Sequence, residues 1–266
     1  MNGSPKAVAI GPRTVAALAV ASAFGVVAFA WPFFASRSSA IGADNVAPVI
    51  FGGLLLLVLA VVLAQLSEGG LDTKALALLG VLSALGAAVR PLGAGTAGVE
   101  TIFFLLVIGG RALGPGFGFS LGCTTLFASA LITSGVGPWM PYQMFACAWI
   151  GLGAGLLPRA GGRREIGMLM AYGAASAFVY GLLLNLSLWP FTLGAQTRLS
   201  FVPGASVIEN LHRYLIYDAT TSLGWDTGRA ITNAILIALA GRAVLGALRR
   251  AARRASFDAP ITFVPA

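Results

Sequence analysis

Apolar runs separated by short polar or proline-containing breaks fill most of the chain. Eight runs predict helices, at Arg13–Phe34, Val46–Leu66, Lys74–Val89, Ala97–Ile108, Pro115–Thr133, Pro141–Leu157, Glu165–Leu188 and Thr227–Leu248. The third run stops at Arg90-Pro91, because the residue before a proline disfavours helix. Several runs are shorter than the roughly 20 residues that cross a bilayer upright. We therefore expect the short helices to be interior or to enter a cavity.

Composition explains how so apolar a chain can exist. Of its 266 residues, 58% are hydrophobic and 10% are charged, whereas an average soluble domain carries roughly a quarter charged residues. A water-soluble protein of this composition could not cover its surface with polar groups, but lipid solvates the outer face of a membrane protein. The sequence therefore predicts an all-α transmembrane protein.

Lysine and arginine are distributed asymmetrically over the predicted loops. If the N-terminus is cytoplasmic, twelve of the seventeen fall on the inner side and five on the outer side, as expected from the excess of basic residues in cytoplasmic loops. We therefore predict a multi-pass membrane protein with both termini cytoplasmic. A bacterial plasma (inner) membrane is the expected location, but this expectation rests on a resemblance in the motifs and not on the charges. The basic residues form no stripe interleaved with aromatic residues, so the net charge of +8 does not predict nucleic-acid binding.

Few residues offer catalytic or metal chemistry. The single histidine, His212, excludes a histidine-cluster metal site, and Cys123 and Cys147 are interpreted as small hydrophobic residues within apolar runs. No lysine follows a glycine loop of the kind that binds ATP phosphates. Ser120 lies in a Gly-x-Ser-x-Gly pattern, but within an apolar helix and far from His212. We predict no cofactor and no catalytic residue, with any ATP hydrolysis in separate subunits.

Small residues recur four apart in four helices and form shallow grooves in which another helix can pack closely. The grooves are Ala17/Ala21/Gly25, Gly80/Ala84/Ala88, Gly114/Gly118/Gly122 and Gly151/Gly155. Packing within the chain is the favoured interpretation. Docking of a partner protein in one of the grooves is the alternative.

Polar and aromatic residues gather at the predicted outer level. Arg90 and Glu100 are functional candidates because ionisable groups at membrane depth are costly, and an ion pair between them is the structural alternative. The further candidates are Trp139, Tyr142, Gln143, Asn185, Trp189, Trp225, Asp226 and Asn233. An interfacial aromatic belt would account for Trp139 and Tyr142 alone. The whole set favours a small-molecule cavity between the helices.

A long predicted outer segment, Trp189–Asp226, contains one further helix. Ser206 and Glu209 have the spacing of a capping box. The apolar residues that follow fall on one helical face, at Val207, Ile208, Leu211 and Leu215. Such a helix is either a lid over the outer surface or a helix that rests on lipid headgroups.

Three motifs resemble the substrate-binding (S) components of energy-coupling factor (ECF) vitamin transporters. They are Gly114-Pro115-Gly116-Phe117-Gly118, Gly137-Pro138-Trp139-Met140-Pro141-Tyr142-Gln143-Met144-Phe145-Ala146 and Gly151-Leu152-Gly153-Ala154-Gly155, followed by Trp225-Asp226 and Asn233. The resemblance covers about residues 74–251. It implies a six-helix substrate-binding core there, two extra N-terminal transmembrane helices within residues 1–73, and a cytoplasmic tail at 252–266.

The resemblance implies a solute-capture subunit of an ATP-driven importer for a vitamin or related micronutrient, with cobalamin the best single candidate. Its partners would be a transmembrane coupling (T) protein, contacted through Gly80, Ala84 and Ala88, and two ABC-type ATPases. The ligand would bind beneath the loops Arg90–Thr96, Ser134–Gln143 and Trp189–Asp226. A self-sufficient channel or secondary transporter and, less favoured, an intramembrane hydrolase that uses Ser120 are the alternatives.

Overall fold

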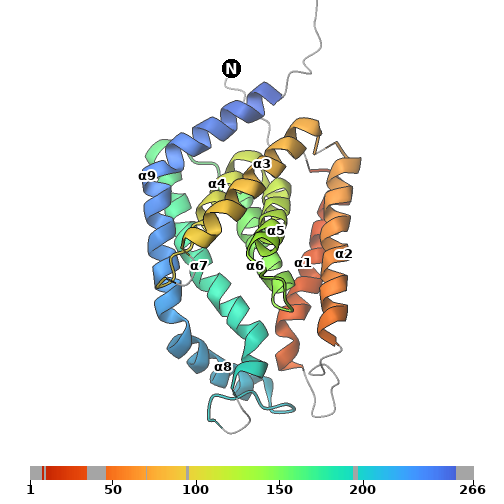
Figure 1. The fold of residues 1–266 in the computed structure, drawn as a ribbon, viewed down its shortest axis with the longest axis vertical. Coiled ribbons are helices and arrows are strands. Elements are labelled where there is room, and N and C mark those ends of the chain that lie inside the picture. Colours follow the sequence, from red (N-terminus) through yellow and green to blue (C-terminus); the bar gives the residue numbers. More distant parts are fainter. Residues whose placement is uncertain are drawn as a thin grey trace, which may run out of the picture.

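The computed structural model describes residues 8, 10–34, 46–69, 71–93, 96–193 and 197–255, which form a bundle of helices without strands (Figure 1). The elements are α1 (Pro12–Ala30), η1 (Trp31–Phe33), α2 (Val46–Ser67), α3 (Thr73–Val89), η3 (Arg90–Leu92), α4 (Ile102–Leu113), α5 (Pro115–Ile132), α6 (Met140–Leu156), α7 (Gly162–Thr192), α8 (Val207–Thr221) and α9 (Leu223–Ala255). Of the predicted basic positions, Lys6 and Arg37 lie outside the described residues, as does the tail beyond residue 255.

Five spans among the described residues are long and apolar enough to cross a membrane. They are Pro12–Phe33, Thr73–Leu92, Pro115–Ile132, Gly162–Thr192 and Leu223–Arg253. Two shorter apolar helices accompany them, at Leu55–Ser67 and Ile102–Leu113. This set of helices indicates a multi-pass membrane protein, as composition predicted.

One predicted helix is displaced along the chain. The run Ala97–Ile108 predicted a helix from its first residue, but α4 covers Ile102–Leu113. The delay has a backbone cause, because Ala97 and Gly98 have φ angles of 45° and 77°, in the left-handed region that an α-helix does not use. Gly114, with φ 104°, ends the helix and lets α5 begin at the next residue.

The glycine stripes of α5 and α6 bring the two backbones into contact. A Cβ atom at Gly118 would collide with the carbonyl oxygen of Gly151, and one at Gly122 would collide with the backbone of Ala148. Gly155 lies equally close to the start of α5. Packing within the chain, the favoured interpretation of these stripes, is confirmed for both helices.

The stripe on α1 is also used within the chain, since it packs against α6. Ala21 is fully buried, and a Cβ atom at Gly25 would lie 2.7 Å from ring atoms of both Phe145 and Trp149. The indole N–H of Trp149 donates a hydrogen bond to the Ser22 hydroxyl at 3.1 Å. The first helix is therefore packed against the bundle.

The stripe on α3 differs from the other three. Gly80, Ala84 and Ala88 are all exposed, and a Cβ atom at Gly80 would have no neighbour within 4 Å. The buried face of α3 lies on α5 instead, with Gly86 against the side chain of Thr125. Among the described residues, nothing in the chain covers the small-residue face of α3.

Polar contacts join α1 and α2 to each other and to α5. The Glu68 carboxylate, just after α2, accepts hydrogen bonds from the backbone N–H groups of Arg13 and Thr14 at 2.7 and 2.8 Å, at the end of α1 where such groups lack helical partners. The buried Gln65 amide of α2 donates to the Ser120 hydroxyl of α5 at 2.9 Å. Since α1 and α2 contact α5, α6 and α7, the N-terminal pair leaves the exposed face of α3 free.

The two ends of the bundle have different chemistry. At the end where α1 begins and α9 finishes (upper end in Figure 1), the buried Glu165 carboxylate accepts hydrogen bonds from Arg111 at 2.7 Å and from Arg249 at 2.6 Å. This triad joins α4, α7 and α9. Exposed arginines surround this end, which we call the basic end: Arg159, Arg163, Arg164, Arg250 and Arg253.

The opposite end is covered by α8 and is called the α8 end. Here the fully buried Trp189 contacts the rings of Phe201 and Tyr214 at centroid distances of 5.4 Å. The serine half of the predicted capping box is formed, because the Ser206 hydroxyl accepts a hydrogen bond from the Glu209 N–H at 3.2 Å. The Glu209 carboxylate instead pairs with Arg213 at 2.9 Å. The predicted apolar face of α8 is exposed and points away from the rest of the chain: Val207, Ile208, Leu211 and Leu215.

Candidate functional site

Arg90 lies where α3 gives way to η3 and reaches into the bundle with few partners. Its guanidinium donates to the Ser129 hydroxyl of α5 at 3.3 Å and to the Gln143 side-chain oxygen of α6 at 3.5 Å. Both contacts are long, and a guanidinium has five N–H donors. Arg90 therefore keeps donor capacity that its neighbours do not use.

Glu100 precedes α4 and carries a buried side-chain oxygen, Oε1, that has no hydrogen-bond partner. The backbone N–H of Ile102 hydrogen-bonds the carboxyl group, and the charges of Arg90 and Arg229 act on it. Burial nevertheless outweighs these charges and raises the pKa of Glu100 above its ordinary value. Neither arginine forms an ion pair with it, so the predicted Arg90–Glu100 pair is not formed.

The first turns of α9 supply three polar side chains on one face. Asp226 is 2% exposed and pairs with Arg229, and its carboxylate occupies the space where Gly181 of α7 lacks a side chain. Asn233 is fully buried, and its amide donates to the carbonyl of Arg229 at 2.9 Å. The Asn233 Oδ1 atom has no partner.

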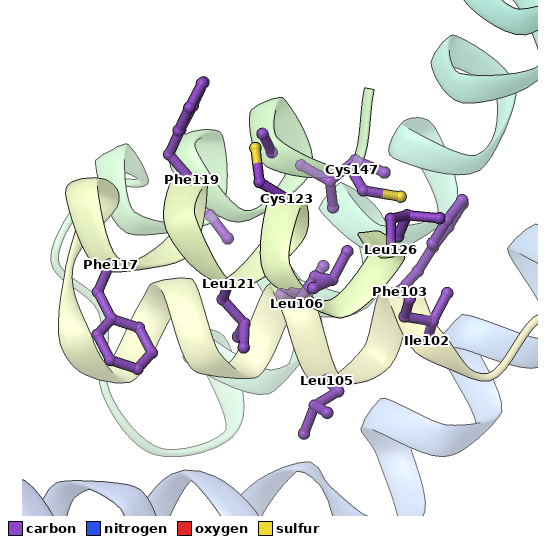
Figure 2. Packing of buried hydrophobic residues seen from close by; sticks show 14 of the residues in the cluster. Ile102, Phe103, Leu105, Leu106, Phe117, Phe119, Leu121, Cys123, Leu126 and Cys147 are labelled. Carbon is purple, nitrogen blue, oxygen red and sulfur yellow. The ribbon is translucent and has the colours of Figure 1, made fainter. Parts of the chain in front are cut away.

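Aromatic rings hold Arg229 against α7 and α4. The guanidinium lies over the Tyr180 ring at 5.3 Å from its centroid, a favourable cation–π geometry. Tyr180 in turn meets the edge of Phe103 at 4.7 Å. Figure 2 shows Phe103 beside Leu126 and Cys147 at one end of the apolar cluster, so the Tyr180 and Phe103 rings connect Arg229 to this cluster.

Electrostatics ties these residues into one cluster. The charges of Arg90, Glu100 and Arg229 all act on the Cys147 thiol and on the Tyr180 hydroxyl. A further buried oxygen without a partner, Thr125 Oγ1, lies one helical turn from Ser129 on α5. We call this set the polar cluster: Arg90, Glu100, Thr125, Ser129, Gln143, Cys147, Tyr180, Asp226, Arg229 and Asn233. The cluster contains residues of η3, α5, α6, α7 and α9 and of the segment before α4.

The other predicted site residues lie elsewhere. Tyr142 packs edge-on against Phe29 of α1 at 5.1 Å, and the Asn185 amide donates to Asp218 of α8 at 2.8 Å. Trp189 lies in the small buried cluster of the α8 end that also contains Leu186, Tyr214 and Tyr217, which we call the cap core, and its indole N–H donates to the carbonyl of Leu199 at 2.7 Å. Trp139 and Trp225 are 41% and 44% exposed, and the backbone of Trp225 contacts Gly98.

The sequence contains signals for some residues of the polar cluster that were not predicted as site residues. Asp226, Arg229 and Asn233 are spaced by three and then four residues, which places them on one helical face. Arg229 is one of the five basic residues counted on the predicted outer side and was not predicted as a site residue. Cys147 follows Gln143 by one turn in the same way. Tyr180 carries no such signal, since its neighbours are apolar and only the fold brings Arg229 to its ring.

The residues on which an intramembrane hydrolase or a metal site would depend do not lie in surroundings that suit this chemistry. The buried Ser120 hydroxyl accepts a hydrogen bond from the Gln65 amide, which is not a base, and His212 is exposed on α8. Within the described ranges, no group of three His, Cys, Asp or Glu residues could hold a metal ion. Comparison with known protein families, with curated proteins and with solved structures finds no match to this chain.

Proposed function

We propose that this protein is the membrane-embedded solute-capture (S) subunit of an ATP-driven ECF-type importer for a vitamin or related micronutrient. The solute binds at the polar cluster, between the helices of the 74–251 core. In this proposal α3–α7 and α9 are the six-helix core, and α1 and α2 are two additional transmembrane helices. The motif resemblance supplies the transporter class, and the cluster supplies the binding site.

The observation that carries the proposal is the unpartnered carboxylate oxygen of Glu100 close to the incompletely used guanidinium of Arg90. A buried polar atom without a partner costs about 1–3 kcal/mol, and more if the group is charged. Ionisable groups inside a membrane protein are functional candidates for this reason. A solute that hydrogen-bonds both groups would recover this free energy on binding.

Orientation follows from the contrast between the two ends. The basic end would face the cytoplasm, in keeping with the excess of arginine in cytoplasmic loops, and the α8 end would face outward. In this orientation, the solute would enter from the side on which α8 lies. The exposed apolar face of α8 then rests on outer-leaflet lipid, since an amphipathic helix at an interface buries its apolar side in the membrane.

Two features favour capture over a self-sufficient channel or secondary transporter. Near the basic end, α5 and α6 are in backbone contact through Gly118 and Gly151, which leaves no polar path between them. The Glu165 triad joins three helices at the same end. A protein closed on its inner side needs a partner to release its solute, which is the division of labour in an ECF-type importer.

The exposed face of α3 is the proposed contact with the coupling protein. Gly80, Ala84 and Ala88 form a shallow groove, and the exposed side chains of Val81 and Leu85 border it. A partner helix packs closely where side chains are small. The two ATPases join through that coupling protein.

Co-expression with the neighbouring genes, followed by purification through a tag on this chain, tests the proposal. We expect an ATPase and a coupling protein to co-purify with the wild type, and Ala84→Leu to remove both. Ala243→Leu, at an exposed alanine of α9, is the matched control and should retain them. If no ATPase co-purifies and no small molecule is released from the pure protein, the proposal is wrong.

A further inference from the structure

The polar cluster contains an excess cation and an excess acceptor that do not neutralise each other. Within the described part of the chain, the Arg90 guanidinium hydrogen-bonds the neutral Ser129 and Gln143 side chains and forms no ion pair. Glu100 has a buried oxygen without a donor, although the positive charges of Arg90 and Arg229 act on it. Each of the two groups can therefore still bind a partner of opposite charge.

Other charged groups in the chain are treated differently. Asp226 and Arg229 pair within the cluster, and Glu165 is held by two arginines at the basic end. A chain that pairs its other buried carboxylates could pair Glu100 with Arg90 at no greater cost, because both ends of that pair are already present. Their separation is a specific property of this site.

The remaining unpartnered oxygens in the cluster have the same character as Glu100. Asn233 Oδ1 can only accept a hydrogen bond, and Thr125 Oγ1 can accept or donate. They belong to α9 and α5. The site therefore presents three buried oxygens without partners, together with the incompletely used guanidinium of Arg90.

Building on the proposed function, we infer that the captured solute carries charges of both signs: an anionic group that Arg90 binds and a cationic nitrogen that Glu100 binds. A carboxylate or phosphate matches the planar guanidinium through paired N–H donors. A protonated amine or a protonated ring nitrogen would donate a hydrogen bond to the free oxygen of Glu100 and favour the ionised form of this carboxyl group. A solute with an anionic group alone would leave a buried carboxylate oxygen without a partner.

The decisive experiment examines small molecules released from the pure wild-type protein. The protein is purified in mild detergent and denatured, and the extract is separated by capillary electrophoresis coupled to mass spectrometry, in strongly acidic and in strongly alkaline buffer. We expect the enriched molecule to migrate as a cation in acid and as an anion in alkali. This measurement needs no variant, so it stands even if substitutions impair folding.

Matched substitutions then assign each charge to its residue. Arg90→Gln and Glu100→Gln should each lower the amount recovered per folded protein by about tenfold or more, as expected for the loss of a charged hydrogen bond. Arg213→Gln and Glu209→Gln change the same residue types in an exposed pair on α8 and should leave recovery unchanged. Thermal unfolding of each preparation gives the folded amount.

The outcomes separate this inference from the function on which it rests. An enriched molecule that migrates only as an anion, or not at all, overturns the assignment of two charges but leaves solute capture intact. Equal recovery from Glu100→Gln and wild type overturns the role of Glu100. If no preparation contains an enriched molecule, solute capture itself is wrong, and the inference falls with it.

Discussion

The same substitution, glycine to alanine, should have opposite effects on stability in α5 and in α3. At Gly118 a Cβ atom would collide with the Gly151 carbonyl oxygen, and would lie 2.5 Å from its carbonyl carbon and 2.9 Å from the Cα of Gly110. Real Cβ atoms essentially never approach closer than 3.0 Å. All three contacts are with backbone, so no side chain can rotate away and the helices must separate.

The magnitudes follow from two opposing contributions. Overpacking of a tight interior costs about 1–3 kcal/mol, whereas alanine gains about 1 kcal/mol over glycine in a helix. Because all three contacts are with backbone, the cost of overpacking falls in the upper part of this range, and Gly118→Ala should lower the free energy of unfolding by about 1–2 kcal/mol. At Gly80 no atom lies within 4 Å of the added methyl, so Gly80→Ala should gain about 0.5–1 kcal/mol.

Thermal unfolding in detergent, followed by tryptophan fluorescence, measures the difference. For a chain of this size 1 kcal/mol corresponds to roughly 2–4 °C in Tm, so the Tm values of the two variants should differ by roughly 3–12 °C, with wild type between them. Equal shifts in the same direction would refute the reasoning. That result would mean that the α5–α6 contact is looser than described, or that α3 is covered.

Three further predictions address the two ends of the bundle. Glu165→Gln should lower the free energy of unfolding by about 3–5 kcal/mol, because it leaves two arginines without their buried carboxylate. Glu209→Gln on the surface should lower it by less than about 0.5 kcal/mol. Unfolding by urea or SDS compares the two variants. Trp189→Ala should cost about 3–5 kcal/mol by removing the centre of the cap core, and Trp189→Phe about 1 kcal/mol, mostly its hydrogen bond to Leu199. Desolvation raises the pKa of Glu68, but hydrogen bonds from Thr14 and Arg13 outweigh it, and the net effect is a lowered pKa. The ionised Glu68 carboxylate therefore stabilises the folded protein above the pKa of the unfolded chain, about 4.3. This stabilisation is lost as the pH falls through the lower pKa of the folded protein. Glu68→Gln should remove that part of the acid dependence of Tm, and an unchanged profile would contradict the assignment.

Much of the helical order could be predicted because apolar runs and prolines are local signals. The start of α5 at Pro115 and the cap of α8 at Ser206 follow from the residues themselves. The start of α4 could not, because Ala97 adopts a positive φ that alanine rarely uses. That conformation is imposed by packing, since Gly98 and Gly228 bring the residues before α4 against the first turn of α9.

The site was predictable in part for the same reason. Arg90, Glu100 and Gln143 stood out as costly groups in apolar surroundings, and the fold brings them near one another. Tyr142 and Trp189 carry the same sequence signal, yet they pack against Phe29 and Phe201. Which way an aromatic residue points depends on contacts with distant segments, and the sequence pattern contains no information about those contacts.

The stripes of small residues show how far a pattern can be interpreted. All four have the same spacing, and the sequence alone could not assign different roles to them. The structure buries three against neighbouring helices and leaves only Gly80, Ala84 and Ala88 exposed. Identical local patterns thus differ in what covers them, which is a property of the fold.

Native mass spectrometry of the intact protein, released from detergent micelles, tests the central claim most directly. Solute capture at the polar cluster predicts a population heavier than the apoprotein by one discrete small-molecule mass in the wild type and in Arg213→Gln. The same population should be strongly reduced in Arg90→Gln. An identical adduct in all three proteins would place the binding elsewhere, and bare protein in every spectrum would contradict the claim.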